Sequence, residues 1–324
     1  MVKINFEFTV KLNIGRKRVG TNVNFGNRSV ADIFLEEISQ IGDLRSIKTK
    51  DNYATATRSF ANYAGCDYPM SKFGSNILEC YERWLKSRGI TLNTISCYMR
   101  SLRSLYNMVS KRYNIADDKI FNGVFTGMTK TRKRSVQIED IKKLMRLTLS
   151  DNSFDSLARD VFVFSFYALG MPFVDVSHLT NENIHAGYIS YCRRKTGQQI
   201  RIPIEPCILE IINKYHTEDR KRIFPLIPDD ENQQTELTYR KVLCKYNKAL
   251  IHLAQMAKTS GTLTSYVVRH TWASLAYSSN VELSVISKAL GHANTKTTLV
   301  YIREIDDKQV ADANRMIINS VSGT

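Results

Sequence analysis

The chain has 324 residues, 43% of them hydrophobic, and a formal net charge of +15 at pH 7. This length and hydrophobic content suit about two domains with sizeable cores, and so large an excess of Lys and Arg indicates nucleic acid as the partner, because phosphates reward cations through counterion release. The alternative, a membrane surface, requires a basic amphipathic helix, a lipidation signal or an apolar run of ~20 residues, and the sequence has none of these.

Six cysteines are scattered along the chain without a CxxC pair or a histidine at ligand spacing. Neither a zinc site nor another metal or cofactor is therefore expected. The N-terminal stretch MVKINFEFTV lacks the features of a signal peptide, so we expect the cysteines to be small apolar residues in a reducing cytoplasm.

Residues 1–28 alternate in part and then turn basic, which predicts a short strand-like basic arm. Residues 29–122 show helical periodicity. The helices expected there span 30–41, 48–64, 75–87 and 92–113.

The third of these helices shows the pattern most clearly, because its apolar residues recur at the 3.6-residue spacing of a packed face. These residues are Ile77, Leu78, Tyr81, Trp84 and Leu85. Basic and polar residues near helix starts and on helix faces can lie along a DNA groove. The candidate DNA contacts of this domain are Arg45, Lys48, Lys50, Asn93, Tyr98, Arg100 and Arg103.

Residues 123–134, GVFTGMTKTRKR, contain two glycines and end in a basic run, which marks the best domain boundary. In a protein of this charge, the run indicates a linker that crosses the DNA backbone rather than a solvated tether. Its candidate DNA contacts are Lys130, Arg132, Lys133 and Arg134.

Residues 135–307 form the second expected domain, which is mainly helical with one small hairpin. The strands GYISYC and QIRIPI alternate apolar and polar residues around a turn that contains Gly197. Gly291 and Asn294 indicate the stop of one helix and the start of a short one after it. The helices expected here span 138–150, 154–169, 206–215, 238–257, 265–278 and 283–290.

Four segments of the second domain are candidates for one functional site because of their order along the chain. The turn RRKTGQ carries Lys195, the helix LTSYVVRHTWASLAY carries Arg269, the turn LGH ends at His292, and ALGHANTKTTLVYI reaches Tyr301. Taken singly, each has a structural explanation: a solvated turn, a salt-bridge partner, a helix cap and an interface tyrosine. Chance rarely supplies all four in this order and spacing, so we interpret them together.

In this order the C-terminal part resembles the tyrosine recombinase (phage integrase) family over about residues 130–307, most strongly in RHTWAS and LGHANTKTTLVYI. The stretches FYALGMPFVDVSHL and TSYVVRHTWA are similar to integrases of mobile elements from the Bacteroidetes. By position and helical pattern, residues 29–122 resemble the family's SAM-like core-binding domain. The resemblance implies a mainly α fold with a small β-hairpin or sheet in the C-terminal domain, a clamp made of a helical core-binding domain and an α/β catalytic domain.

Phosphodiester chemistry explains why such residues would gather. The transition state spreads negative charge over the non-bridging oxygens, which guanidinium forks and an imidazole N–H stabilise, and a phosphotyrosyl bond keeps the phosphodiester energy without metal or cofactor. The resemblance assigns the catalytic roles by position: Tyr301 as nucleophile, Arg269 and His292 as phosphate ligands, Lys195 as general acid, Asp175 as a brace, and Tyr266 where the family usually has His or Lys.

One catalytic position lacks the residue that the family implies. The first arginine normally lies two residues after the glycine of ALGMPF, where this chain has Pro172, and related integrases often carry it just before the glycine, where this chain has Leu169. A missing guanidinium could lower the rate ~100-fold. Three explanations stay open: another cation such as Arg193 or Arg194 replaces it, this copy is catalytically weak, or the chain is a variant altered at Leu169.

The sequence therefore predicts a site-specific DNA recombinase that cuts and rejoins double-stranded DNA through a 3′-phosphotyrosyl intermediate. The resemblance implies a homo-tetramer on DNA, with a monomer as the alternative in its absence, and a C-terminal tail, residues 308–324, exchanged between protomers. Two other functions stay open: a catalytically weak or inactive DNA-binding relative, and a type IB topoisomerase-like activity.

Overall fold

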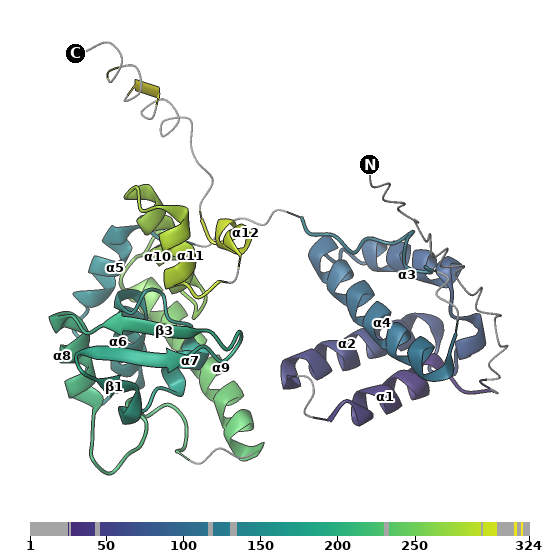
Figure 1. The fold of residues 1–324 in the computed structure, drawn as a ribbon, viewed down its shortest axis with the longest axis horizontal. Helices are drawn as coiled ribbons and strands as arrows, with labels where there is room; N and C mark the ends of the chain where they lie inside the picture. The colour runs from purple at the N-terminus through teal and green to yellow at the C-terminus, as the bar shows by residue number, and fades with distance from the viewer. Residues whose placement is uncertain are drawn as a thin grey trace, which may run out of the picture. The chain divides into compact units, whose positions relative to one another are not determined.

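The computed structural model describes residues 25, 27–42, 46–115, 119–129, 135–229, 233–292, 294–302, 314–315 and 319. The chain divides into two compact units, Met1–Thr131 and Arg132–Thr324 (Figure 1), and each has a hydrophobic core of its own. Most of the expected N-terminal arm, the basic end of the linker and most of the expected C-terminal tail lie outside the described residues. Within the described parts, every helix is too short or too polar to cross a bilayer.

The first unit is helical, as its periodicity predicts. Ser29, Ser46 and Thr91 cap three of its helices, because each side-chain oxygen accepts the backbone N–H of the residue three positions later. The elements of this unit are α1 (Val30–Gln40), α2 (Ile47–Ala64), the short 3-10 helix η2 (Met70–Lys72), α3 (Ser75–Ser87) and α4 (Leu92–Tyr113).

Helix α4 is the longest element of the first unit, and it packs against α1, α2 and α3. Its residues Met99 and Leu102 are fully buried, as are Leu78 and Tyr81 on the predicted inner face of α3. Aromatic rings fill much of this core, and the ring centroids of Phe60 and Tyr81 lie 5.4 Å apart. The helical core predicted from sequence periodicity is thus confirmed.

The second unit combines helices with one small antiparallel sheet of order β1-β2-β3. Strands β2 and β3 form the predicted hairpin, in which Ile189 lies opposite Ile202 and both side chains are buried. The elements in chain order are α5 (Ile138–Met145), α6 (Phe154–Tyr167), α7 (Phe173–Ser177), η3 (Asn181–Asn183), β1 (Ile184–His185), β2 (Tyr188–Cys192), β3 (Gln199–Pro203), α8 (Pro206–Tyr215), α9 (Gln233–Met256), α10 (Val267–Ser278), α11 (Leu283–Ala289) and α12 (Thr295–Leu299).

Helix α6 forms the centre of the second core and packs against α5, α8, α9 and α10. The sequence predicts that it continues to residue 169, but it ends at Tyr167. The reason is a left-handed turn, in which Leu169 has a φ of 58° and Gly170 a φ of 67°. This turn directs the chain into α7 and places the Gly170 backbone against α10.

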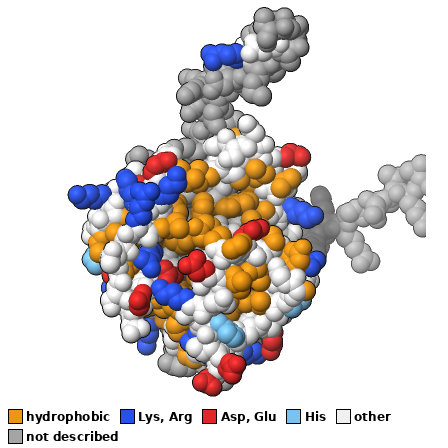
Figure 2. All heavy atoms as spheres, turned by 90° about the vertical axis from the view of Figure 1, so that its left-hand side faces the viewer, with side chains coloured by type: hydrophobic (Ala, Val, Ile, Leu, Met, Phe, Trp, Pro, Cys, Tyr) orange, Lys and Arg blue, Asp and Glu red, His pale blue; other side chains and the backbone are white. Residues whose placement is uncertain are grey.

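Figure 2 shows the second unit from the left-hand side of Figure 1, where α5 and α8 lie. Hydrophobic side chains gather on this face, and Lys, Arg, Asp and Glu side chains are scattered around and between them. The exposed apolar residues of α5 and α8 are Ile138, Met145 and Leu209. This face is therefore not the continuous basic surface that a phosphate backbone favours.

Candidate active site

Arg269 lies on α10 and is 4% exposed. Its guanidinium donates one hydrogen bond from Nη1 to the Gly170 carbonyl at 3.0 Å and another from Nη2 to the Leu290 carbonyl. Gly170 is required here, because a Cβ at this position would lie 3.0 Å from the Arg269 Cα. The turn after α6 and the end of α11 thus fix the direction of this guanidinium.

His292 follows Gly291, which has a φ of 61° and ends the α11 segment. The His292 ring contacts two polar partners: Nε2 lies 3.3 Å from Arg269 Nη2, and Nδ1 lies 2.9 Å from Thr298 Oγ1. Burial, and then the charges of Arg269, Arg193 and Lys195, lower the pKa of His292 to about 4. The imidazole is therefore neutral at pH 7 and acts as a hydrogen-bonding group rather than as a cation.

Tyr301 is 6% exposed and lies in a cluster of rings. Its ring stacks on His270 with 4.7 Å between centroids and lies 5.1 Å from the His292 ring. The Arg269 Cζ lies 5.5 Å from the Tyr301 ring centroid. The short helix α12, capped by Asn294 as the sequence predicts, leads directly into Tyr301. The structure therefore brings three of the expected catalytic residues, Tyr301, Arg269 and His292, together.

Tyr266 precedes α10, and its hydroxyl lies 2.8 Å from the Tyr301 hydroxyl. Partial burial of a side chain that stays 56% exposed, followed by the hydrogen bond to Tyr301, raises the pKa of Tyr266 to about 12. Tyr266 therefore remains a neutral phenol near pH 7 and can donate a hydrogen bond to the Tyr301 oxygen. It is poorly suited to accept a proton, because its phenolate form is strongly disfavoured.

Asp175 lies on α7 and is 3% exposed. Its Oδ1 accepts the backbone N–H of Arg194 at 3.0 Å, which ties α7 to the start of the hairpin turn. Burial raises the pKa of Asp175, although the Arg194 N–H and the charges of Arg193 and Arg269 act in the opposite direction. The bracing function of Asp175 stays a prediction.

Lys195 lies exposed in the turn between β2 and β3. The turn is closed by hydrogen bonds from the Arg193 N–H to the Gln198 carbonyl and from the Gly197 N–H to the Arg193 carbonyl, both 2.8 Å long. The Lys195 charge contributes to the lowered pKa of His292. Lys195 is thus within electrostatic range of the site but at its outer edge.

The two positions without the expected arginine are Leu169 and Pro172. Leu169 packs against the core of the second unit, and Pro172 precedes α7.

Two further residues lie at the site, Arg193 and Thr298. The sequence indicated Arg193 only as a substitute cation, and it did not indicate Thr298. Both side chains are buried next to the expected catalytic residues, where Arg193 donates to the Gly291 carbonyl and Thr298 contacts His292.

The candidate DNA contacts of the first unit have different environments. Lys48, Arg100 and Arg103 are exposed, and Lys50 and Tyr98 are half-buried. The Asn93 side chain is already used in the fold, because it exchanges two hydrogen bonds with the Thr129 backbone, 3.1 and 2.9 Å long. Arg45, Lys130, Arg132, Lys133 and Arg134 lie outside the described residues.

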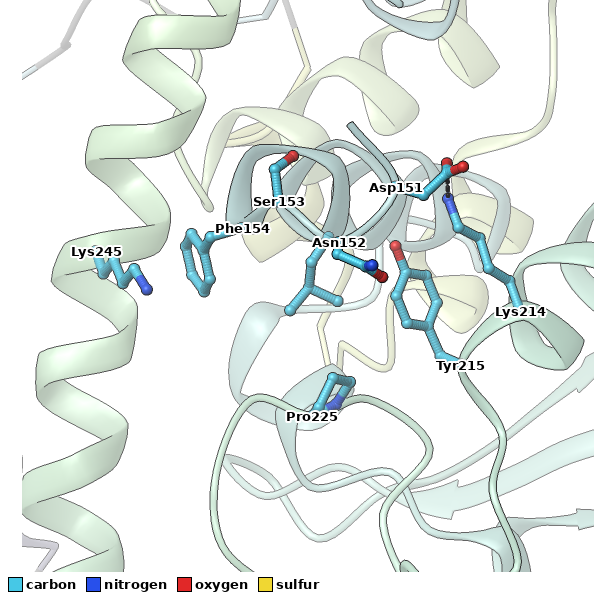
Figure 3. Close-up of a pocket in the computed structure, with 9 residues that line it drawn as sticks. Asp151, Asn152, Ser153, Phe154, Lys214, Tyr215, Pro225 and Lys245 are labelled. Carbon is cyan, nitrogen blue, oxygen red and sulfur yellow. Dashed lines mark ion pairs between the residues drawn. The ribbon is translucent and has the colours of Figure 1, made fainter. Parts of the chain in front are cut away.

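A pocket of about 720 Å³ lies between the start of α6, the end of α8 and helix α9 (Figure 3). Its lining includes Asp151, Phe154, Lys214 and Tyr215, and none of the six expected catalytic residues. Lys214 Nζ and Tyr215 Oη both donate to the Asp160 carboxylate, at 2.7 and 2.8 Å. The polar groups at this pocket therefore hold α8 against α6.

A tyrosine ring beside a guanidinium and two imidazoles, on a helical unit with a small antiparallel sheet, is the arrangement of the tyrosine-type DNA strand transferases. Residues 134–308 match the model of the phage integrase family, and residues 29–123 match the phage integrase SAM-like domain. The chain therefore belongs to the phage integrase family.

Curated relatives include the tyrosine recombinase XerA of Pyrococcus furiosus, 22% identical over 74% of this chain and 80% of that protein. The tyrosine recombinase XerD of Listeria monocytogenes serotype 4b is 23% identical over 79% of this chain and 88% of that protein. A lambda integrase dimer bound to a COC′ core site has a similar fold, with a TM-score of 0.65 and 15% identity, covering 86% of this chain and 99% of that one. The Tn1549 transposon integrase in complex with a circular intermediate DNA has a TM-score of 0.60 and 15% identity, covering 89% and 99%.

Proposed function

We propose that this protein is a site-specific DNA recombinase that cuts and rejoins double-stranded DNA through a 3′-phosphotyrosyl intermediate. The observation that carries the proposal is the juxtaposition of Tyr301 with Arg269 and His292, where the Arg269 Cζ lies 5.5 Å from the Tyr301 ring. Membership of the phage integrase family supports the same conclusion.

In the proposed reaction, the Tyr301 oxygen attacks the scissile phosphorus, a P–O(Tyr) bond forms, and the bond from phosphorus to the 5′ oxygen breaks. Arg269 and the neutral His292 hydrogen-bond the non-bridging oxygens, where negative charge increases in the transition state. Lys195 donates a proton to the departing 5′ oxygen. The Tyr301 phenol gives up its proton to solvent water, and Tyr266 donates a hydrogen bond to the Tyr301 oxygen in this step, because the two hydroxyls lie 2.8 Å apart. A 5′-hydroxyl from a second strand then attacks the phosphotyrosine and restores the phosphodiester.

The first unit is proposed to bind the DNA duplex through its exposed basic side chains. Lys48, Arg100 and Arg103 are exposed cations on α2 and α4. The basic residues at 130–134, in the linker that joins domains 29–122 and 135–307, are proposed to contact the DNA backbone. Asn93 is the weakest of these candidates, because its amide is already bonded to the Thr129 backbone.

The proposed working assembly is a homo-tetramer on DNA, and we expect its location to be the cytoplasm. Among solved structures of similar fold is a lambda integrase tetramer bound to a Holliday junction, with a TM-score of 0.60. Exchange of residues 308–324 between protomers remains part of this proposal. The stretches FYALGMPFVDVSHL and TSYVVRHTWA further support a relationship to integrases of Bacteroidetes mobile elements.

Covalent capture tests the proposed chemistry and identifies the target sequence in the same experiment. Sheared genomic DNA from the source organism is incubated with the protein, denatured with detergent, and DNA that stays attached to protein is sequenced. The wild-type protein is expected to retain fragments that end at a shared sequence, and Tyr301→Phe is expected to retain none. Tyr277→Phe is the matched control, because Tyr277 packs against the same cluster from α10 and should leave capture unchanged.

The absence of arginine at Leu169 and Pro172 favours one second candidate, a non-catalytic DNA-binding relative. It predicts salt-sensitive DNA binding with no covalent product from the wild-type protein. A topoisomerase-like activity would instead give covalent ends without a shared sequence and relaxation of any supercoiled plasmid. Either result would reject the site-specific recombinase.

A further inference from the structure

Arg193 directly follows β2, and its side chain is buried where its neighbours are exposed. The period of two along the strand places Ile189 and Tyr191 on one face, and Arg193, one residue past the end of β2, continues that alternation. Arg193 is 5% exposed, whereas Arg194 and Lys195 are exposed. A buried guanidinium at the start of a hairpin turn is unusual, because turns normally direct charged side chains into water.

The Arg193 side chain runs directly to the segment that carries His292. Its Nη1 donates a hydrogen bond of 2.8 Å to the carbonyl of Gly291. Gly291 leaves room for this approach, because a Cβ there would lie 3.3 Å from the Arg193 Cδ and 2.7 Å from the Ile200 Cδ1. The glycine of the LGH turn therefore allows the hairpin to bring Arg193 next to His292.

The charge of Arg193 acts on the other groups of the site. After burial, it is the next cause of the lowered pKa of Arg269, and it also lowers the pKa of His292. The two guanidiniums are thus close enough to repel each other in a buried environment. Two like charges in such a place are costly unless an anion lies between or beside them.

The hydrogen-bonding of these groups is also incomplete. Among the described residues, Arg193 Nε, Arg269 Nε and Asp175 Oδ2 are buried without a hydrogen-bond partner. Asp175 is the carboxylate that opposes both guanidiniums, and its pKa is raised by burial. Two guanidiniums with unused donors and only one carboxylate opposing them leave a net positive charge, which suits an additional anion.

We propose that Arg193 binds the scissile phosphate as the second guanidinium of the site and replaces the arginine that is absent at Leu169 and Pro172. This inference rests on the proposed recombinase function. Arg269 approaches the phosphate from α10 and Arg193 from the hairpin, so that donors from two elements surround the non-bridging oxygens. Arg194 is not the substitute, because its backbone N–H contacts Asp175 while its side chain is exposed.

The test compares cleavage of two synthetic duplexes that carry the sequence found by covalent capture. Both are nicked beside the cleavage position to trap the adduct. One has an ordinary scissile phosphate, and the other has a methylphosphonate, in which a neutral methyl group replaces one charged oxygen. The variants are Arg193→Ala and Arg193→Gln, since the Gln amide can still donate to the Gly291 carbonyl. Arg194→Ala is the matched control from the adjacent position.

Loss of Arg193 is expected to reduce cleavage of the ordinary phosphate by ~100-fold or more, as for a lost oxyanion donor. On the methylphosphonate, the same variants are expected to come within ~10-fold of the wild-type rate, because less charge needs to be stabilised. A structural function of Arg193 would lower both rates by the same factor. Arg194→Ala should cleave both duplexes within ~3-fold of wild type, as a change away from the phosphate.

The deciding quantity is the ratio of the phosphate rate to the methylphosphonate rate. A ratio that falls in Arg193→Gln supports the inference, and an unchanged ratio in Arg193→Gln overturns it, whether or not Arg193→Ala folds. Failure of the underlying function is recognised separately, because the wild-type protein would then form no covalent adduct with either duplex.

Discussion

The Thr298 hydroxyl is the hydrogen-bond partner of His292 Nδ1 in either tautomer of the ring. Thr298 is fully buried, and its Oγ1 lies 2.9 Å from His292 Nδ1. When Arg269 donates to Nε2, Nδ1 carries the hydrogen and donates to Thr298. A hydrogen bond from Nε2 to phosphate requires the other tautomer, in which the Thr298 hydroxyl donates to Nδ1. A hydroxyl can serve both arrangements because it is both donor and acceptor.

Thr298→Val should therefore slow DNA cleavage by about 10-fold, similar to the loss of other residues that orient a histidine. The side-chain shape is kept, but Nδ1 loses its partner. Thr298→Ser should keep most of the activity, because it retains the hydroxyl. The measurement is the rate of covalent adduct formation at saturating DNA, with the melting temperature as a check on folding. Equal rates for the Val and Ser variants would contradict this role.

At the scale of elements, the polar contact between α6 and α8 contributes stability away from the site. Burial raises the pKa of Asp160, but hydrogen bonds from Arg159, Lys214 and Tyr215 outweigh this effect, so the net pKa is lowered. A carboxylate with a depressed folded pKa contributes stability above its unfolded pKa of about 3.9, and that contribution is lost as the pH falls through the folded value. The network should therefore be fully effective at pH 7.

Asp160→Asn should lower the free energy of unfolding at pH 7 by about 2–3 kcal/mol, because charged hydrogen bonds to a largely buried group are lost. Asp151→Asn is the matched control, since the Asp151 side chain is 89% exposed and lies 3.8 Å from the same Lys214 Nζ (Figure 3). It should cost less than ~1 kcal/mol. Urea unfolding at pH 7 and at lower pH measures the free energy of unfolding of both variants. The loss of this free energy in Asp160→Asn, relative to wild type, should become smaller as the pH falls.

The elements that could be predicted from sequence are those set by local periodicity and caps. Alternation in β2 and β3 identified the buried Ile189 and Ile202, and Asn294 marked the start of α12. The end of α6 was misplaced, because Leu169 adopts a left-handed conformation that its side chain disfavours and that tertiary contacts impose. β1 was not predicted, since a strand of two residues has no period.

Only part of the site could be predicted from local sequence patterns. Motif order identified Tyr301, Arg269 and His292, and the structure brings them together. The inward direction of Arg193 was already contained in the alternation that begins at Ile189, but its charge favoured the interpretation as a solvated turn. Its burial depends on Gly291, about a hundred residues later in the chain, and such a contact leaves no trace in a local pattern.

At the scale of the whole molecule, the net charge of +15 must act through cations that are free to meet phosphates. Some of the cations are already paired inside the fold, such as Lys86 with the largely buried Glu82 at 2.5 Å. Others, such as Arg100 and Arg103 on α4, have exposed side chains. The number of Lys and Arg side chains that contact phosphates is therefore smaller than the net charge suggests. The salt dependence of DNA binding measures that number.

For ~6–10 phosphate contacts, the affinity for duplex DNA should fall by ~10³–10⁵ between 50 mM and 200 mM salt. Arg100→Ala should reduce the slope of log affinity against log salt by about 1, because one fewer counterion is released. Lys86→Ala removes the same formal charge from the same unit, but it should leave the slope unchanged, because Glu82 already neutralises that ammonium. Fluorescence anisotropy with a labelled duplex at several salt concentrations gives both slopes. Equal slopes for the two variants would mean that net charge alone, rather than the position of each cation, controls the binding of DNA.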